Sequence, residues 1–386
     1  MATTLLQAPT AAARRRKKRQ RVTAPKLLKK LSLDQRTNAP TFAPAPLRTM
    51  NRGELLYYGK GLWAEQQTFY LLSLHDNKML KVTAPFNAYV RKNPGMKVQR
   101  WDRRPMHEQF HITKLLYYDR RHQEAGFEVE DAIGGAKVRR HFLMQWDLKT
   151  NAISQATLVA RSRSGQTYTH MLPLGYDSQR REFLYVRQVI GKDASDRTIF
   201  VIGFSSRKPR VVAQFEGKRS MSSKTYFDDV HHRALLVEYA ELASKGPAPK
   251  GHLVDTVSGK VRHFPIPLTT YGVAFGAAGK RLYTYSAQLG QLWTIDAVSG
   301  AKLQSLKVGK LGHEIGRVSK RELLLLRNSG LRFLSLTRKG VRPGRWVPIK
   351  QIYTGFSHVG GSLVLPRRAL VKNGDLLYIV EPRPAR

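Results

Sequence analysis

The stretch that decides the fold runs from Tyr271 to Val308 and reads YGVAFGAAGKRLYTYSAQLGQLWTIDAVSGAKLQSLKV. It holds four short runs rich in residues that favour β-structure, and Gly, Ala and Ser gather between them. Those runs are Gly272–Gly276, RLYTYS, QLWTID and KLQSLKV. Short apolar runs bounded by turn residues predict strands, so this stretch predicts a unit of four consecutive strands.

The end of this unit recurs along the chain. DTVSGKV at Asp255 parallels DAVSGAK at Asp296, and similar endings occur at SLHDNKMLKV, QWDLKTNAISQATLV, FSSRKPRVVAQF and LSLTRKGVRPGRWVPI. They place turns near residues 77, 150, 207, 258, 299 and 339, of which the last three are one unit apart. Four strands repeated about every forty residues are typical of the blades of a β-propeller, an all-β fold.

The beginnings of the units repeat as well, with an apolar strand, a polar turn that contains a basic residue, and a second apolar strand. They read LLYYDRRHQEAGFEV, LGYDSQRREFLYV, YFDDVHHRALLVEY, VAFGAAGKRLYTYS and IGRVSKRELLLLR. With a partial unit at GELLYYGK and a closing one around SLVLPRRALVKNGDLLYIVE, the sequence predicts seven four-stranded blades over residues 51–386. The closing unit lacks a fourth strand, and Thr37–Arg48 is predicted to supply it.

Two segments do not fit the repeat. The turns near residues 77 and 150 are more than one unit apart, which predicts an insertion loop at the rim over residues 86–109. Residues 1–50 form a basic tail with prolines at positions 40, 44 and 46. High charge with low hydrophobicity predicts disorder or an extended linker in this tail. Within it, Pro25–Leu33 (PKLLKKLSL) is compatible with a short helix.

Three of these motifs also carry a family resemblance: QWDLKTN around Trp146 and Asp147, VDTVSGK from Val254, and IDAVSGA from Ile295. On these motifs the chain resembles the broad propeller superfamily of tryptophan-aspartate (WD40-like) and YVTN-like repeats, over roughly residues 51–386. The resemblance implies a propeller that acts as a scaffold for protein–protein interaction, since only a minority of such proteins are enzymes that use the central channel. A fold of this kind does not by itself assign a function.

Charge is the most unusual property of the composition. The 386 residues include 67 Lys and Arg against 27 Asp and Glu, for a formal net charge of +40. Residues 1–52 hold 13 basic residues and one acid, so the remaining 54 basic and 26 acidic residues leave the body at +28. A folded body with this excess favours an anionic partner such as nucleic acid, a ribonucleoprotein or an acidic protein. The competing interpretation is a basic surface that serves solubility alone.

Other features exclude whole classes of mechanism. The chain contains no cysteine, which rules out disulfides, thiolate zinc sites and cysteine nucleophiles. No apolar window is long enough for a transmembrane helix. The basic cluster follows a weakly apolar start, the reverse of a signal peptide, so an intracellular protein of the cytoplasm, nucleoid or nucleus is expected, with organelle import as an alternative.

Two basic segments are candidate polyanion-binding sites. In the tail, seven of the eight residues from 14 to 21 are Lys or Arg, and flexible cations of this kind contact several phosphates. In the insertion loop, aromatic residues interleave with cations, a pattern that suits single-stranded nucleic acid because rings stack on bases. The predicted residues are Arg14, Arg15, Arg16, Lys17, Lys18, Arg19, Arg21, Arg91, Lys92, Arg100, Trp101, Arg103 and Arg104. The alternatives are a targeting or solubilising tail and a loop that packs Trp101 onto the rim.

Histidines near the predicted inner strands form a weaker candidate site. They are His111, His170, His313 and His358. Inner strands converge on the channel of a propeller, where imidazoles can bind a metal or transfer protons. Most histidines in such positions are simply packed in the core or rim. No nucleotide-binding or hydrolase motif is present, and the sequence assigns neither a catalytic residue nor a cofactor.

The sequence therefore favours a non-enzymatic scaffold that uses a basic surface and tail to bind an anionic partner, either RNA or DNA or an acidic protein. Two alternatives stay open: an enzyme with a His-lined channel, and a structural subunit of a larger assembly.

Overall fold

The computed structural model covers most of the chain in separate segments. It describes residues 26–32, 41–42, 54–58, 68–73, 79–92, 110–131, 138–163, 170–190, 197–205, 209–219, 221, 226–239, 248–310, 312–319, 321–327, 330–338, 340–348, 364–365, 368–373 and 376–381. Over these residues the secondary structure is β-strand apart from one short helix, α2 (Phe86–Lys92).

Five consecutive four-stranded antiparallel sheets form the middle of the chain, and the strands of each follow one another in sequence. The first contains β6 (Phe110–Asp119), β7 (Glu124–Asp131), β8 (Val138–Asp147) and β9 (Ala152–Arg163). The second contains β10 (His170–Asp177), β11 (Glu182–Ile190), β12 (Arg197–Phe204) and β13 (Pro209–Gly217). The third contains β14 (Tyr226–Asp228), β15 (Arg233–Val237), β16 (Lys250–Asp255) and β17 (Val261–Pro265). The fourth contains β18 (Thr270–Phe275), β19 (Arg281–Ser286), β20 (Gln291–Asp296) and β21 (Lys302–Lys307). The fifth contains β22 (Gly312–Ser319), β23 (Glu322–Arg327), β24 (Gly330–Thr337) and β25 (Gly340–Pro348).

Strands from the two ends of the chain pair in further sheets. One has the order β2 (Thr41–Phe42), β3 (Glu54–Tyr58), β4 (Thr68–Ser73) and β5 (Met79–Thr83). Another has the order β1 (Lys26–Ser32), β28 (Leu376–Glu381), β27 (Arg368–Asn373) and β26 (Val364–Leu365). Here a strand near the amino terminus pairs antiparallel with the last strand of the chain.

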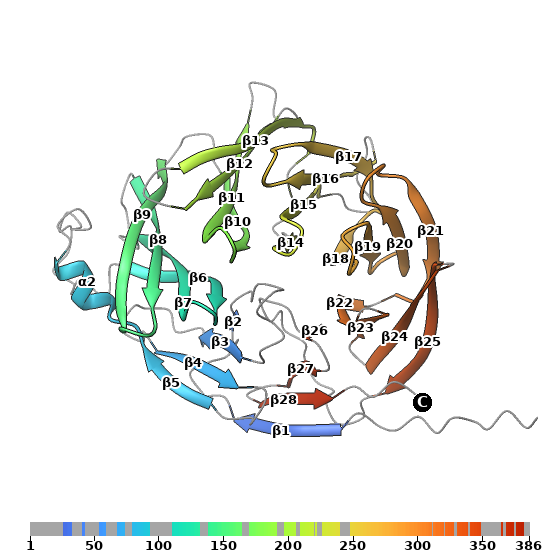
Figure 1. The fold of residues 1–386 in the computed structure, drawn as a ribbon, viewed down its shortest axis with the longest axis horizontal. Helices are drawn as coiled ribbons and strands as arrows, with labels where there is room; N and C mark the ends of the chain where they lie inside the picture. Colours follow the sequence, from blue (N-terminus) through green and yellow to red (C-terminus); the bar gives the residue numbers. More distant parts are fainter. Residues whose placement is uncertain are drawn as a thin grey trace, which may run out of the picture.

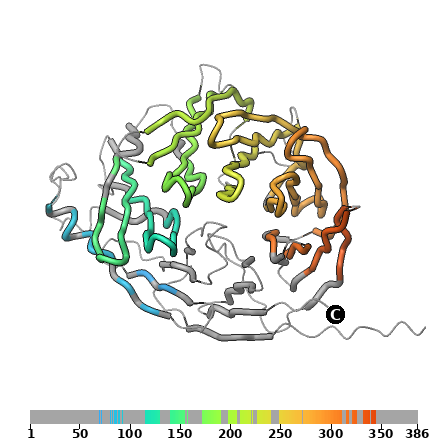
Figure 2. Tube along the Cα trace, viewed as in Figure 1, coloured from blue at the N-terminus to red at the C-terminus, as the bar shows by residue number. Residues whose placement is uncertain are grey.

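The sheets stand side by side around a ring (Figure 1). In the five central sheets the first strand lies near the centre and the fourth at the outside, whereas in the sheet of β1, β28, β27 and β26 the strand β26 lies near the centre and β1 at the outside. In Figure 2, the part of the tube coloured green through orange, which holds the five central sheets, follows the same arc. This is the arrangement of a β-propeller, in which each sheet is a blade packed face to face against its neighbours.

The repeat that predicts the fold is reproduced closely. RLYTYS and QLWTID coincide with β19 and β20, and the inner strand predicted at Gly272–Gly276 is β18. Every residue of β19 after Arg281 is buried, since both faces of a middle strand are covered by neighbouring blades, whereas the outermost strand β21 is largely exposed. This difference explains why middle strands read as continuous apolar runs.

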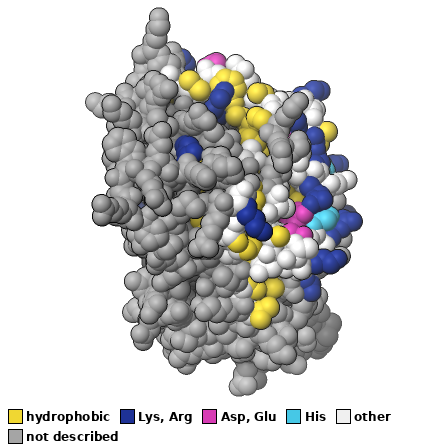
Figure 3. Space-filling view, turned by 90° about the vertical axis from the view of Figure 1, so that its left-hand side faces the viewer, with side chains coloured by type: hydrophobic (Ala, Val, Ile, Leu, Met, Phe, Trp, Pro, Cys, Tyr) yellow, Lys and Arg dark blue, Asp and Glu magenta, His cyan; other side chains and the backbone are white. Residues whose placement is uncertain are grey.

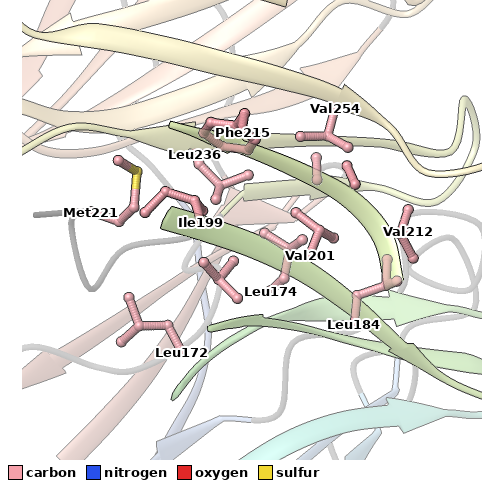
Figure 4. Close-up of a cluster of buried hydrophobic side chains, with 13 residues drawn as sticks. Leu172, Leu174, Leu184, Ile199, Val201, Val212, Phe215, Met221, Leu236 and Val254 are labelled. Carbon is pink, nitrogen blue, oxygen red and sulfur yellow. The ribbon is translucent and has the colours of Figure 1, made fainter. Parts of the chain in front are cut away.

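The core lies between blades. In the cluster shown in Figure 4, Leu184 and Val201 of the second sheet pack with Leu236 and Val254 of the third. All four side chains are fully buried or nearly so. Burying each such side chain contributes about 1.5–3 kcal/mol, so the seams between blades carry much of the stability.

Two predictions about the amino-terminal region are wrong. The segment predicted as a helix forms strand β1, and this strand, rather than Thr37–Arg48, completes the sheet of β26, β27 and β28. Thr41–Phe42 instead pairs with β3 as the first strand of another sheet. Prolines at positions 40, 44 and 46 lack the N–H that a long ladder needs, while residues 26–32 contain no proline. Strands β1 and β2 lie inside the tail for which disorder is predicted.

The predicted insertion begins as a helix. α2 lies at the outside of the ring (Figure 1), where Phe86 is buried and Tyr89 packs against the core of the first sheet. Residues 93–109 lie outside the described part of the chain.

Candidate functional surface

One end of the blades carries most of the polar turns that the structure describes. In an antiparallel four-stranded sheet, the turn between strands one and two and the turn between strands three and four lie at the same end. We call this end the turn face, the former turns inner turns and the latter outer turns. Contacts between inner turns of successive blades show that the blades share this orientation: Arg181 pairs with Glu124, His232 with Asp177, and Arg233 donates to the carbonyl of Gly279.

A buried aspartate organises each of three inner turns. Asp119, Asp177 and Asp228 end their inner strands, and each is almost completely buried. Their Oδ1 atoms accept backbone N–H groups two and three residues later, at 2.9 and 3.4 Å for Asp119, 3.0 and 3.1 Å for Asp177, and 3.0 and 3.4 Å for Asp228. Such side-chain bonds hold a tight turn, so these carboxylates are structural.

The remaining oxygen of each aspartate meets a histidine. Nδ1 of His122 lies 2.7 Å from Asp119, and Nδ1 of His231 lies 2.7 Å from Asp228. His232 reaches across the seam to the preceding blade, where its Nδ1 lies 2.5 Å from Oδ2 of Asp177. These three histidines are not among the four that the sequence predicts as candidates.

Outer turns contain the same aspartate-to-backbone hydrogen bonds, but these turns face solvent. Asp147, Asp255 and Asp296 accept the N–H groups two and three residues later at 2.7–3.2 Å. Hydrogen bonds from Ser299 and Val298 lower the pKa of Asp296, and those from Thr150 and Lys149 lower the pKa of Asp147. These carboxylates are therefore ionised at neutral pH and occupied by the chain's own backbone.

Several arginines of the turn face connect neighbouring blades. Arg210 makes a bidentate ion pair with buried Glu182, with both N···O distances at 2.6 Å. Arg180 and Arg210 both donate to the carbonyl of Thr256 in the next blade, at 3.2 and 3.3 Å. In the same manner, Arg262 donates to the carbonyl of Ala297 at 3.0 Å. These cations stabilise the ring, and the net charge of the body overstates what a partner can contact.

A second set of cations is exposed on the turn face. Within the described part of the chain their side chains make no hydrogen bond or ion pair, and they belong to four different blades. They are Arg121, Lys149, Lys260, Lys280 and Arg338. Lys and Arg side chains gather along the right-hand edge of Figure 3, next to histidine and acidic groups. Since the acids of the inner and outer turns bind backbone N–H groups, the accessible charge of this face is positive.

The predicted polyanion sites are placed only in part. Arg91 and Lys92 belong to α2, and Lys92 is exposed. The cluster Arg14–Arg21 and the loop residues Arg100, Trp101, Arg103 and Arg104 lie outside the described residues. The free cations of the turns were not predicted as a site, although each stands beside a turn motif that the sequence shows.

The predicted channel histidines fall on three inner strands. His111 and His313 are the second residues of β6 and β22, His170 is the first residue of β10, and His358 lies outside the described part. These positions are at the end of the blades opposite the turn face. Among described residues, no three His, Asp or Glu side chains are grouped to hold a metal ion.

A separate titratable cluster lies at the seam of the second and third sheets. Nε2 of His252 is 3.2 Å from Oε1 of Glu238, and Nδ1 of His252 is 2.6 Å from Nδ1 of His263. Phe215 of the neighbouring blade stacks on His252 at a centroid distance of 4.7 Å. Partial burial and the charges of His252 and Lys250 lower the pKa of His263. Burial opposes the ionisation of Glu238, but hydrogen bonds from His252 and Lys250 outweigh it and lower the pKa of Glu238.

Comparison with known proteins identifies the fold. No protein-family profile matches the chain, and no curated protein matches it in sequence. Solved structures do match. One from the mitotic checkpoint complex has 10% identity and a TM-score of 0.56 over 99% of this chain and 98% of that chain. The Dos1 propeller has 10% identity and a TM-score of 0.56 over 92% and 95%. Sqt1 from Saccharomyces cerevisiae has 6% identity and a TM-score of 0.52 over 94% and 100%.

The predicted β-propeller fold is thus confirmed. This is a fold typically used as a binding scaffold. No helix in the described part is long and apolar enough to cross a membrane.

Proposed function

We propose that this protein is a non-enzymatic scaffold that holds an anionic partner on the turn face of its propeller. The observation that carries the proposal is the division of charge on that face. The aspartates Asp119, Asp177 and Asp228 of the inner turns and Asp147, Asp255 and Asp296 of the outer turns accept backbone hydrogen bonds, while Arg121, Lys149, Lys260 and Lys280 are exposed and make no hydrogen bond or ion pair within the described part. A partner that neutralises these cations releases counterions, which supplies affinity without any catalytic group.

The scaffold is proposed to have seven blades. The orders β2-β3-β4-β5 and β1-β28-β27-β26 support this number, because they flank the five central sheets. Pairing of β1 with β28 would then close the ring with strands from both ends of the chain. Closure of this kind protects the edges of the sheets.

The partner is proposed to be RNA, DNA, a ribonucleoprotein or an acidic protein inside the cell. The tail cluster Arg14–Arg21 precedes β1 in the sequence, and its cations are proposed to contribute to binding. Two contributions are expected, one from the tail and one from the turn face.

Binding of polyglutamate and of a single-stranded oligonucleotide over a range of salt concentrations tests both contributions. Deleting residues 1–25 leaves β1 intact and should weaken binding and flatten the salt dependence. The charge reversal Lys260→Glu with Lys280→Glu should weaken binding at least tenfold, because it places carboxylates in the path of the partner.

A matched control is available at the other end of the blades. Lys307→Glu with Lys310→Glu makes the same change in net charge at exposed positions away from the turn face. This pair should weaken binding much less. Equal losses for both pairs would show that net charge alone attracts the anion, and the proposal would be wrong.

A further inference from the structure

Exposed aliphatic side chains collect near the turn face. The described part of the chain exposes seven large hydrophobic side chains. Strand direction places five of them toward the turn face, namely Leu80, Val211, Val257, Val298 and Leu303, and it places Val189 and Tyr239 toward the opposite end. Single exposed aliphatic residues are ordinary, whereas a set that shares one end of the ring is not.

Three of these side chains are valines in three successive blades, and each lies at or next to an outer turn. Val211 is 59% exposed, Val257 is 59% exposed and Val298 is 53% exposed. Arg210, next to Val211, donates to the carbonyl of Thr256, which precedes Val257. Between the third and fourth sheets, Arg262 donates to the carbonyl of Ala297, which precedes Val298. We call Val211, Val257 and Val298 the valine rim.

The turns themselves do not require valine at these positions. Val257 and Val298 stand two residues after Asp255 and Asp296, and each contributes only its backbone N–H to the aspartate, at 3.1 and 2.8 Å. Any residue except proline supplies that donor. The hydrogen bonds of the turns do not use these aliphatic side chains, which are therefore available for contact with another molecule.

The charges around the valine rim select an acidic occupant. Lys260 is exposed beside Val257, and Lys280 is exposed in the adjoining inner turn. The nearby acids are occupied: Glu182 is buried against Arg210, and Asp255 and Asp296 hold their turns. An occupant that meets this surface therefore needs negative groups for the cations and apolar groups for the valines.

A surface that binds single-stranded nucleic acid exposes aromatic side chains, and the surface around the valine rim differs in this respect. Unpaired bases stack on aromatic rings, and no aromatic residue is among the exposed large hydrophobics toward the turn face in the described part. Trp146 is buried with its Nε1 bound to Asn151, and the ring of Trp293 lies under Nζ of Lys302 at 4.5 Å.

We propose that the valine rim docks an acidic segment of a partner protein that carries aliphatic side chains between its carboxylates. This inference rests on the proposed function and names the partner class and the residues for it. Carboxylates of the segment meet Lys260 and Lys280, and its aliphatic side chains cover Val257 and Val298.

Fluorescence anisotropy with the full-length protein tests this with three probes: a synthetic peptide that alternates Glu with Leu and Val, polyglutamate of equal charge, and a thymidine oligonucleotide of equal charge. The alternating peptide should bind at least tenfold more tightly than polyglutamate. Val257→Ser with Val298→Ser should remove about fivefold to tenfold of that affinity and leave polyglutamate binding unchanged. The matched control Val189→Ser should bind all three probes as the wild type does.

The outcomes separate this inference from the proposed function. If the protein binds none of the probes, both fail. Equal affinity for the two peptides, or no effect of the double valine variant, overturns the valine rim and leaves anion binding standing. Tighter binding of the oligonucleotide than of the alternating peptide also overturns it, in favour of a nucleic-acid partner.

Discussion

The inner and outer turns of the blades share one local design and differ in what surrounds it. At both, an aspartate at the end of a strand accepts hydrogen bonds from the backbone N–H groups two and three residues later. Inner aspartates such as Asp177 are buried and bind a histidine as well, whereas the outer Asp296 is held by its own turn in contact with water. The comparison teaches that inner turns join blades through their aspartate and histidine side chains. Outer turns join the preceding blade through backbone carbonyls, those of Thr256 and Ala297, which leaves side chains at the tips of these turns to solvent and partners.

The largest effect is expected at the arginine that links the two kinds of turn. Arg210→Ala removes the bidentate partner of Glu182, whose side chain is 1% exposed, and should destabilise the protein by about 3 kcal/mol. Urea unfolding measures this loss. Arg262→Ala removes a bond to a carbonyl alone and should cost about 1 kcal/mol. Similar losses for the two variants would mean that the buried acid is not the reason for the effect.

A direct comparison of inner and outer aspartates comes next. Asp177→Ala leaves two N–H groups and His232 without their acceptor in a buried turn, and should lower the free energy of unfolding by about 2–3 kcal/mol. Asp296→Ala exposes its turn N–H groups to water and should cost about 1 kcal/mol. Thermal and urea unfolding of both variants would contradict the comparison if the outer change were the more harmful.

The pH dependence of stability reports on His263 and Glu238 at the seam of the second and third sheets. The pKa of His263 lies below its ordinary value of 6.5, so the unfolded chain takes up a proton more readily than the folded one. Stability from this residue is therefore full above pH 6.5 and is lost as the pH falls through the lower folded pKa. Glu238, whose pKa is also lowered, adds a loss at more acidic pH, below 4.5.

His263→Gln should flatten the decline of Tm just below pH 6.5 by about 1 °C, and should leave the decline below pH 4.5 in place. Calorimetry at a series of pH values measures both. An unchanged profile between the two pH values would show that His263 does not titrate against folding.

The smallest effect is expected at the outer turn tips. Val257→Ser changes an exposed side chain that contributes only its N–H to the turn, so unfolding should change by less than about 0.5 kcal/mol. A loss above about 1 kcal/mol would mean that this valine packs within the protein, which would remove it from the valine rim.

Much of the fold follows from the sequence because a middle strand of a blade is covered on both sides. RLYTYS and QLWTID are read correctly for this reason, and the turn motifs DTVSGK and DAVSGA mark their ends. The segment that completes the last sheet is misplaced, since KLLKKLS carries lysines at helical spacing and its partner, β28, lies at the far end of the chain.

The site is less predictable than the fold for a related reason. A count of Lys and Arg shows that the body is basic, but it does not show that Arg210 is held by Glu182 or that Arg262 binds a carbonyl of the next blade. Asp177 and His232 are 55 residues apart, and only the packing of two blades brings them together. Which cations remain for a partner is decided by contacts between blades.

Pairing of β1 with β28 also sets an order of events during synthesis. Residues 26–32 leave the ribosome early, whereas their partner is made only when the chain reaches residues 376–381. Until then, the backbone groups that pair with β28 have no partner from that strand, and unpaired strand edges are templates for pairing with other chains. The three lysines of β1, Lys26, Lys29 and Lys30, are the kind of residue that discourages such pairing at a free edge. The lysines of β1 thus oppose aggregation before β28 is made, and the same strand pairs with β28 once the chain is complete to residue 381.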